Sequence, residues 1–295
     1  MKRKYKKILK FVYIVAFVVA GFAASELFKG SFKPIKPNPV DLSAVGDTVS
    51  VISAGQADSA LISSGGKYCL IDAGQTDTGD TNVVQYLRSA GVKEIELFVI
   101  THFHTDHTSE VMDVLDNFRV KTIVIPNLSK QNVPTTQFFT AFLDRVERDD
   151  ISLKPAQKGD VYTVGSGMLT ILDDTYNDLS VNDTSVAILF VQDDFSYLST
   201  GDGEAEYEER LLKVFSDRVT LFAAGHHGSS TSNTEKFISA IKPKFVAVSA
   251  GRENEYGHPH NEVTKRFKDK NIQYNVTFSD GTLVYSIKDK KLIAY

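Results

Sequence analysis

The chain has 295 residues, with 33 Lys and Arg against 37 Asp and Glu, 42% hydrophobic residues, no Trp and one Cys. This composition is typical of a globular protein and excludes a disordered chain, a collagen and a small scaffold held by disulfides. A chain of this length can bury a full core, so any metal ion is expected to serve chemistry rather than folding.

Charge is unevenly distributed along the chain. Residues 1–10 contain six Lys and Arg and no acidic residue, so the remainder carries 27 basic against 37 acidic side chains, a net charge of −10. Such a body repels polyanions at long range. A nucleic acid would therefore have to be held by a local cation cluster or by metal ions.

An apolar run at 11–28 follows the basic decapeptide, and its only charge is Glu26. Its length of about 18 residues lies between a signal-peptide core and a full membrane span. We expect residues 1–28 to be a membrane anchor, with a signal peptide cleaved before Ala24 as the alternative. The basic residues then hold the N-terminus in the cytoplasm, so the domain lies outside the cell membrane or, after cleavage, is secreted. Residues 29–45 are expected to be a linker, and 46–295 a hydrolase domain.

The domain is predicted to contain blocks of strands with helices between and after them. A meander of strands is expected at 47–53, 59–64 and 67–73, then a helix near 80–90, a strand at 95–101, a helix at 109–118, a strand at 120–126 and a helix near 135–148. Next come strands at 160–165, 168–174, 184–192 and 195–200, a helix at 204–215, a strand at 219–225, a helix at 234–241, a strand at 244–251, a helix at 262–269 and a closing hairpin with its turn at Asp280-Gly281. Cys69, in the third strand, is expected to be a small core residue. The pattern indicates an α/β fold in which helices cover the sheets.

All seven histidines fall in three loops, each directly after an apolar strand. They are His102, His104 and His107 in the first loop, His226 and His227 in the second, and His258 and His260 in the third. Surface histidines placed at random would be scattered, and core histidines would sit inside strands. The ends of strands are where α/β folds assemble their sites, so the clustering predicts one functional site.

The first loop, 101–107, has the spacing of a metal site. In an extended segment, alternate side chains point the same way, so His102 and His104 can bind one cation while Phe103 faces the core. Asp106 and His107, after the bend, can bind a second cation. Two cations about 3.5–4 Å apart can share a water molecule and a substrate oxygen.

The motif His-x-His-x-Asp-His is the signature of the metallo-β-lactamase superfamily, which this chain resembles. Five further stretches are similar to the subset found in the C-terminal region of ComEC-type competence proteins, the DNA-uptake channels: 55–58, 70–74, 199–206, 226–233 and 256–259. The resemblance implies an αββα sandwich preceded by the N-terminal helix, with two divalent metal ions, zinc or manganese, at the rim between the two sheets.

Two aspartates take their expected roles from this resemblance. Asp202 resembles the family's bridging carboxylate, since the two oxygens of one short side chain can each reach a different cation. Asp72 resembles a residue that orients the metal-binding loop without binding metal itself.

The second and third histidine loops supply the remaining expected site residues. Neighbours in an extended segment face opposite ways, so one of His226 and His227 can bind metal while the other meets substrate; we expect His226 to be the ligand. His258 is expected to protonate a leaving group or bind a phosphate oxygen, and His260 to lie on the surface. From the same motifs, Ser229, Asn233 and Tyr256 are expected to contact substrate.

One departure from the superfamily pattern concerns the first cation. Many members place another ligand histidine before the bridging aspartate, but no histidine occurs between His107 and Asp202. Asn182 and Ser185 are expected to lie beside the ligands there, where an amide or hydroxyl oxygen could take part. Such a set is weaker for zinc and more favourable for manganese.

The expected reaction is hydrolysis by water whose pKa the cations lower, with Asp106, His227 and His258 taking part in catalysis. The resemblance favours a phosphodiester substrate, with extracellular DNA first. A cell-surface phosphodiesterase acting on small or wall-linked esters of the phosphocholine type is the alternative, and a non-catalytic metal-binding module is the second alternative. No protein partner is predicted.

Overall fold

The computed structural model describes residues 45–75, 79, 81–129, 132–173 and 180–294. The apolar run at 11–28 and nearly all of the predicted linker lie outside these ranges, so the anchor and the domain boundary remain predictions. Among the described helices, none combines the length and the apolar character that crossing a membrane requires.

The first of two β-sheets has eight strands within the described residues, in the order β15-β14-β1-β2-β3-β4-β5-β6. They are β1 (Thr48–Val51), β2 (Ala60–Ser64), β3 (Lys67–Ile71), β4 (Glu94–Val99), β5 (Arg119–Ile125), β6 (Ser152–Pro155), β14 (Leu283–Ser286) and β15 (Lys291–Ala294). Strands β1 to β3 pair antiparallel, as the predicted meander, and β3 to β6 pair in parallel. Since parallel strands end at the same edge, the loops after β3 and β4 lie close together.

The second sheet has seven strands in the described part of the chain, in the order β13-β12-β11-β10-β9-β8-β7. They are β7 (Val161–Val164), β8 (Gly167–Asp173), β9 (Ala187–Gln192), β10 (Phe195–Ser199), β11 (Leu221–Ala223), β12 (Phe245–Val248) and β13 (Gln273–Val276). It repeats the plan of the first sheet, because β7 to β10 pair antiparallel and β10 to β13 pair in parallel. The loops after β10, β11 and β12 therefore share one edge.

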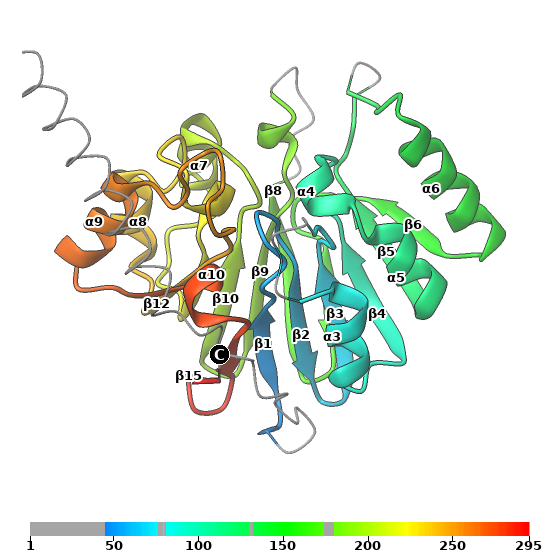
Figure 1. Ribbon diagram of the computed structural model, residues 1–295, viewed down its shortest axis with the longest axis horizontal. Coiled ribbons are helices and arrows are strands. Elements are labelled where there is room, and N and C mark those ends of the chain that lie inside the picture. The colour runs from blue at the N-terminus through cyan, green and yellow to red at the C-terminus, as the bar shows by residue number, and fades with distance from the viewer. Residues whose placement is uncertain (1–44, 76–78, 80, 130–131, 174–179, 295) are drawn as a thin grey trace, which may run out of the picture. The chain divides into compact units, whose positions relative to one another are not determined.

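Helices cover the outer faces of both sheets (Figure 1), which gives the predicted αββα arrangement. The first sheet is covered by α3 (Val83–Ser89), α5 (Val111–Asn117) and α6 (Gln137–Arg148), and the second by α7 (Ala205–Leu211), α8 (Glu235–Ile241) and α9 (Asn261–Asp269). Short helical turns lie in the connections: α4 (Thr105–Thr108), η1 (Asn182–Thr184), η2 (Gly225–Gly228) and α10 (Thr277–Asp280).

The core divides into three layers because strand side chains alternate between the two faces of a sheet. On β4, Phe98 packs outward with the residues of α3, α5 and α6, whereas Leu97 packs inward between the sheets. On β11, Leu221 joins the layer between the sheets, and Phe222 packs outward with Phe237 of α8. Both sheets are thus held face to face by apolar side chains, including the buried Cys69.

The predicted closing hairpin at Asp280-Gly281 is wrong. These residues end the helical turn α10, and the strands on either side, β13 and β14, belong to different sheets. The hairpin that closes the chain joins β14 and β15 instead. The prediction also missed β6, an edge strand with mostly exposed residues and therefore little apolar periodicity.

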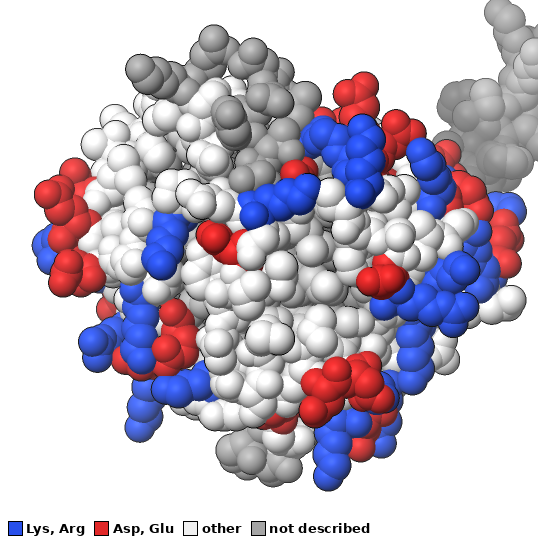
Figure 2. Space-filling model, turned by 180° about the vertical axis from the view of Figure 1, so that it is seen from behind, with Lys and Arg blue, Asp and Glu red and all other residues white. Residues whose placement is uncertain are grey.

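Basic and acidic side chains are interspersed around a broad uncharged area on the face shown in Figure 2. Several of the exposed charges form ion pairs, among them Lys265 with Asp269 and Lys236 with Glu209. Over the described part of this face, charge is not gathered into the continuous basic surface that typically binds a nucleic-acid backbone.

A buried glutamate joins α7 to the start of α8. The carboxylate of Glu208 is fully buried and accepts hydrogen bonds from the backbone N–H groups of Asn233 and Thr234, at 2.6 and 2.9 Å. Burial raises the pKa of Glu208 to about 7, although these hydrogen bonds lower it. Because the folded value exceeds the ordinary value of 4.5, the unfolded chain releases this proton first, and stability is lost as pH rises from about 4.5 to about 7.

We therefore expect the free energy of unfolding to fall by about 3 kcal/mol more between pH 5 and pH 8 in the natural chain than in Glu208→Gln. The comparison requires urea unfolding of both forms at each pH, with Glu206→Gln on the exposed face of the same helix as the control. Parallel pH dependence of the natural chain and Glu208→Gln would show that this carboxyl does not titrate as described.

Candidate metal centre

The predicted site residues meet where parallel strands of both sheets end. Asp72 follows β3, the segment 101–107 follows β4, Asp202 follows β10, and His226 and His227 follow β11. Two glycines allow the loops to approach: a Cβ atom on Gly74 would overlap the backbone of Asp106, and Gly201 has a φ of +52° directly before Asp202. The end of the sandwich thus brings together residues that are far apart in the sequence.

Asp72 orients the histidines of the first loop. Its carboxylate accepts hydrogen bonds from the backbone N–H and the hydroxyl of Thr101, each at 2.7 Å, and lies 2.8 Å from Nδ1 of His107. The Nδ1 of His102 lies 3.2 Å from the same Thr101 hydroxyl. Since Thr101 donates to Asp72, its oxygen can accept from His102, so Nδ1 of each histidine has an acceptor and Nε2 is the nitrogen that can bind a cation at the centre. This is the geometry expected of a residue that orients the loop.

The first group of ligand atoms comes from His102, His104 and Asp202. The Nε2 atom of His102 lies 3.1 Å from Nδ1 of His104 and 3.7 Å from an oxygen of Asp202. Phe103, between the two histidines, packs on Phe139 and Phe142 of α6, as the alternation predicts. Three converging lone-pair donors at these separations can bind one cation.

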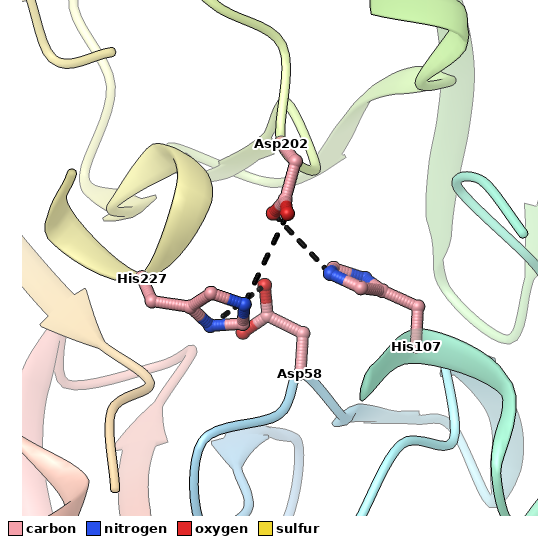
Figure 3. A group of neighbouring side chains, drawn as sticks. All are labelled: Asp58, His107, Asp202 and His227. Atoms are coloured by element: carbon pink, nitrogen blue, oxygen red, sulfur yellow. Dashed lines mark ion pairs between the residues drawn. The ribbon is translucent and has the colours of Figure 1, made fainter. Parts of the chain in front are cut away.

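The second group comes from Asp58, His107, Asp202 and His227 (Figure 3). The Nε2 atom of His107 lies 3.2 Å from one oxygen of Asp202, and Nε2 of His227 lies 3.9 Å from the other. Nδ1 of His227 lies 3.9 Å from Asp58 and 3.1 Å from the carbonyl oxygen of Ser249, to which it can donate. Asp202 belongs to both groups, which is the position expected of a bridging carboxylate.

His227 belongs to the second group, and Nε2 of His226 also lies 3.7 Å from an oxygen of Asp202, so the expected ligand role of His226 stays a prediction. His227 is buried within the second group, whereas the side chain of His226 is 22% exposed and its Nδ1 lies 3.2 Å from the hydroxyl of Thr231. The backbone explains the difference, because both residues are left-handed, with φ of 50° and 54°, and not extended as the prediction assumed. The alternation of an extended segment therefore does not apply here.

Asp106 lies beside the second group, and its expected role as a metal ligand stays a prediction. Its carboxylate is 3.1 Å from Nε2 of His227, and its side chain is 31% exposed. Burial raises the pKa of Asp106, but the hydrogen bond with His227 and the nearby His107 outweigh this effect and lower the pKa to about 2. Asp106 is therefore ionised at neutral pH and faces both the ligands and the cavity.

The carboxylates of the centre also change the pKa values of its histidines. Burial lowers the pKa of His227, but Asp202 and Asp58 outweigh it and raise the value to about 9. Burial similarly opposes the effect of Asp202 and Asp72 on His107, whose pKa lies well above its ordinary value. Burial of His102, together with the nearby His107, holds its pKa well below the ordinary value. The centre therefore concentrates negative charge that a cation can balance.

Two buried atoms at the centre support the fit of a metal ion. Nε2 of His107 and the Asp202 oxygen that lies 3.2 Å from it are both buried, and neither has a further hydrogen-bond partner among the described residues. Such atoms are rare in folded proteins, and an ion is one of the partners that explains them. The nitrogen and oxygen donors present are those that bind zinc or manganese.

Ser185 contacts two residues of the first group, and Asn182 lines the cavity beside it. The Ser185 hydroxyl accepts a hydrogen bond from the backbone N–H of Asp202 at 3.1 Å and lies 3.4 Å from Nδ1 of His102. Asn182 lines the cavity, its amide donates to Glu204 at 3.2 Å, and its buried oxygen lacks a partner within the described structure. Ser185 thus supports the ligands, and the Asn182 oxygen is available to a further group.

A cavity of about 780 Å³ opens beside the two groups. It is lined by Gln56, Gln75, His104, Thr105, Asp106, Asn182, Asp202, His226, His227, Glu253, Asn254, Glu255, Tyr256 and His258. His258 and Tyr256 thus line this cavity, and their expected roles toward a substrate stay predictions, while His260 accepts a backbone hydrogen bond from Ser230.

Two predicted substrate contacts lie elsewhere. Asn233 is fully buried; its oxygen accepts from the N–H of Gly225, and its amide donates to the carbonyls of Gly225 and Ser229. The Ser229 hydroxyl is also buried and contacts Thr231. Neither side chain lines the cavity, because Asn233 brackets the histidine loop and the Ser229 hydroxyl is turned to Thr231.

The sequence analysis did not predict two residues that lie at the site. Asp58 and Gln56 lie in the motif 55–58, which was noted for its resemblance but given no role. Gln56 accepts from the N–H of Gly251 at 3.0 Å and donates to Nδ1 of His258 at 3.1 Å. The sequence did offer a signal for their role. The motif comes directly before β2, which pairs with β3, the strand that leads to Asp72.

Comparison with known proteins gives a consistent result. The family model described as the metallo-beta-lactamase superfamily matches residues 52–252. ComE operon protein 3 of Bacillus subtilis (strain 168) is 28% identical over 84% of this chain and 34% of its own length, and competence protein ComA of Neisseria gonorrhoeae is 25% identical over 81% and 32%. The chain thus spans about a third of the length of these curated relatives.

Among solved structures, Igni18, a metallo hydrolase of Ignicoccus hospitalis, aligns with a TM-score of 0.54 at 15% identity. The alignment covers 81% of this chain and 98% of that one. At this identity the match establishes the fold alone.

Proposed function

The chain belongs to the metallo-β-lactamase superfamily and is similar to ComEC-type competence proteins, and from this premise we propose that it is a phosphodiesterase using two divalent cations. The observation that carries the proposal is the pair of ligand groups that share Asp202. A carboxylate shared by two cation positions holds the two cations close together. Two neighbouring cations can then both contact the negatively charged oxygens of a phosphodiester.

The ligands would be His102, His104 and Asp202 at one position, and Asp58, His107, His227 and the same Asp202 at the other. When bound, zinc or manganese supplies Lewis-acid activation of water and of a substrate oxygen. Asp72 holds Nδ1 of His107, and Ser249 holds Nδ1 of His227, so that both Nε2 atoms face the centre. Asp106, ionised beside the second position, would add negative charge that helps to hold the cation there.

His258 has two candidate roles, and its contacts favour binding a phosphate oxygen. Gln56 donates to its Nδ1, so the ring proton lies on Nε2, from which it can donate to substrate. Burial and the neighbouring His227 lower the pKa of His258 to about 4, so a neutral ring is expected at pH 7. A neutral donor stabilises a phosphate oxygen without supplying a full proton.

DNA is the leading substrate, since the relatives include proteins named for competence. A small-ester phosphodiesterase is the second candidate. It is favoured by the cavity, where no Lys or Arg occurs among the described lining residues. Single-pass anchoring with the domain outside the membrane, or secretion after cleavage, remains our proposal for location, based on the basic residues before the apolar run at 11–28.

The first test is hydrolysis of bis(p-nitrophenyl) phosphate with added manganese or zinc. We expect turnover that chelation abolishes, and a loss of at least about a hundredfold in His104→Ala, because a direct ligand should matter more than an outer partner. Thermal unfolding with chelator present checks that the variant is folded. Absence of turnover by the folded natural chain with either metal would favour a non-catalytic binding module.

The second arm uses end-labelled single-stranded and double-stranded DNA. Cleavage of either labelled strand under the same metal conditions supports the nuclease. Intact DNA alongside ester turnover would replace it with the small-ester phosphodiesterase.

A further inference from the structure

An exposed aromatic ring stands at the cavity beside the metal centre. Tyr256 lines the cavity, and 67% of its surface is exposed. A tyrosine ring usually buries most of its apolar surface, so one that is free on a cavity wall is available to a ligand.

Tyr256 is the outer member of a row of rings that leads to the metal centre. Its ring is stacked on His258, with centroids 5.6 Å apart and an interplanar angle of 21°. His258 is stacked in turn on His227, at 6.1 Å and 26°. Because His227 belongs to the second ligand group, a planar group placed against this row would lie near the reacting centre.

The loop that carries Tyr256 is held in place by several hydrogen bonds. Asn254 accepts from the N–H of His258 and donates to the carbonyls of Gly251 and His258. Gln56 contacts Gly251 and His258, and Nε2 of His260 lies 3.1 Å from the carbonyl oxygen of Tyr256. These bonds fix the backbone that carries the ring, so less freedom is lost when a ligand binds, which favours the use of this loop as a binding surface.

The charges around the cavity argue against recognition through additional phosphates. Its described lining contains the carboxylates of Asp106, Asp202, Glu253 and Glu255 but neither Lys nor Arg. Carboxylates repel charged groups that lie away from the two cation positions, so the further phosphates of a bound strand would have to lie outside the cavity. Substrate recognition outside the two cation positions must therefore come from uncharged contacts, of which stacking on an exposed ring is the most direct.

We propose that Tyr256 is a stacking platform for a nucleobase carried next to the scissile phosphodiester, and that the substrate class is single-stranded nucleic acid. The inference rests on the proposed phosphodiesterase activity. Single strands are required because a base in a duplex is already stacked and paired, whereas an unpaired base can lie flat on the ring. A choline or polyol ester offers no planar group to this surface.

The kinetic test compares two substrates that release the same nitrophenolate: the p-nitrophenyl ester of thymidine 5′-phosphate, and methyl p-nitrophenyl phosphate. In the 295-residue chain with manganese, the ratio of kcat/KM for the first ester to that for the second should fall about tenfold in Tyr256→Ala, as expected for the loss of one base–aromatic stack. The change should lie mainly in KM. Tyr256→Phe, which keeps the ring, should preserve the ratio, and so should Glu262→Gln, an exposed position on α9 outside the cavity lining.

A binding measurement tests the platform independently of hydrolysis. With manganese present and phosphorothioate-linked strands that resist hydrolysis, fluorescence anisotropy should show that Tyr256→Ala binds a labelled oligothymidylate about tenfold more weakly than the natural chain, with a much smaller difference for an abasic strand of equal length. If the natural chain hydrolyses neither ester, the phosphodiesterase proposal fails while this comparison still decides the platform. Equal losses for both esters, or equal binding of both strands by both proteins, would overturn it.

Discussion

Replacing Asp202 with Asn is expected to lower kcat/KM for phosphodiester hydrolysis by at least about a thousandfold, because the bridging charge supports several kcal/mol of transition-state stabilisation. Asp202 is 1% exposed and belongs to both ligand groups, so one substitution weakens both cation positions. Asn has the same shape but only one oxygen, so it cannot contact two cations in the same way. Initial rates with bis(p-nitrophenyl) phosphate over a range of manganese concentrations measure the effect.

The matched control is Asp193→Asn, the same chemical change in the turn between β9 and β10. Asp193 is exposed and has a φ of 52°, which Asn also tolerates, so activity should not change. Excess metal should not restore Asp202→Asn. Activity within tenfold of the natural chain would mean that Asp202 does not bridge the reacting centre.

Replacing Asp72 with Asn is expected to weaken metal binding by about 10–100-fold, the usual cost of losing a partner that orients a ligand histidine. The carboxylate accepts from both Thr101 and His107, whereas an amide must place its N–H₂ group toward one of them. Directed at Nδ1 of His107, that group would move the ring proton to Nε2, which faces Asp202. Asn tolerates the φ of 54° at this position, so the backbone is not strained.

Metal titration separates this effect from that of Asp202→Asn, because excess manganese should largely restore the activity of Asp72→Asn. Unfolding with chelator should also show a loss of about 1–3 kcal/mol, because a buried hydrogen bond is broken. An unchanged metal affinity would contradict the orienting role. Asp193→Asn again serves as the control.

The sequence predicted much of the fold because the apolar periodicity was strong. The opening meander, the strand before the first histidine loop and the alternation of His102, Phe103 and His104 all depend on a period of two residues, which local side chains determine. By contrast, the turn signal at Asp280-Gly281 was local, while the choice of sheet for β13 and β14 depends on distant partners. No short-range pattern carries that information.

The candidate site was predictable to a similar extent. Asp72, Asp202 and the first loop lie together because parallel strands end at a common edge. The different burial of His226 and His227 was not predictable from the alternation of an extended segment. Their left-handed backbone depends on the side chain of Asn233, which brackets Gly225 and Ser229. Asp58 enters the second group only because the loop before β2 packs against Asp106, whose carbonyl accepts the N–H of Asp58.

The most direct test of the central claim is the metal content of the purified chain after equilibration with manganese or zinc, measured by elemental analysis beside Asp202→Asn and Asp193→Asn. We predict two equivalents in the natural chain and in Asp193→Asn, and fewer than one in Asp202→Asn, because both ligand groups include Asp202. Two equivalents retained by Asp202→Asn, or none bound by the folded natural chain with either metal, would contradict a centre of two cations bridged by this carboxylate.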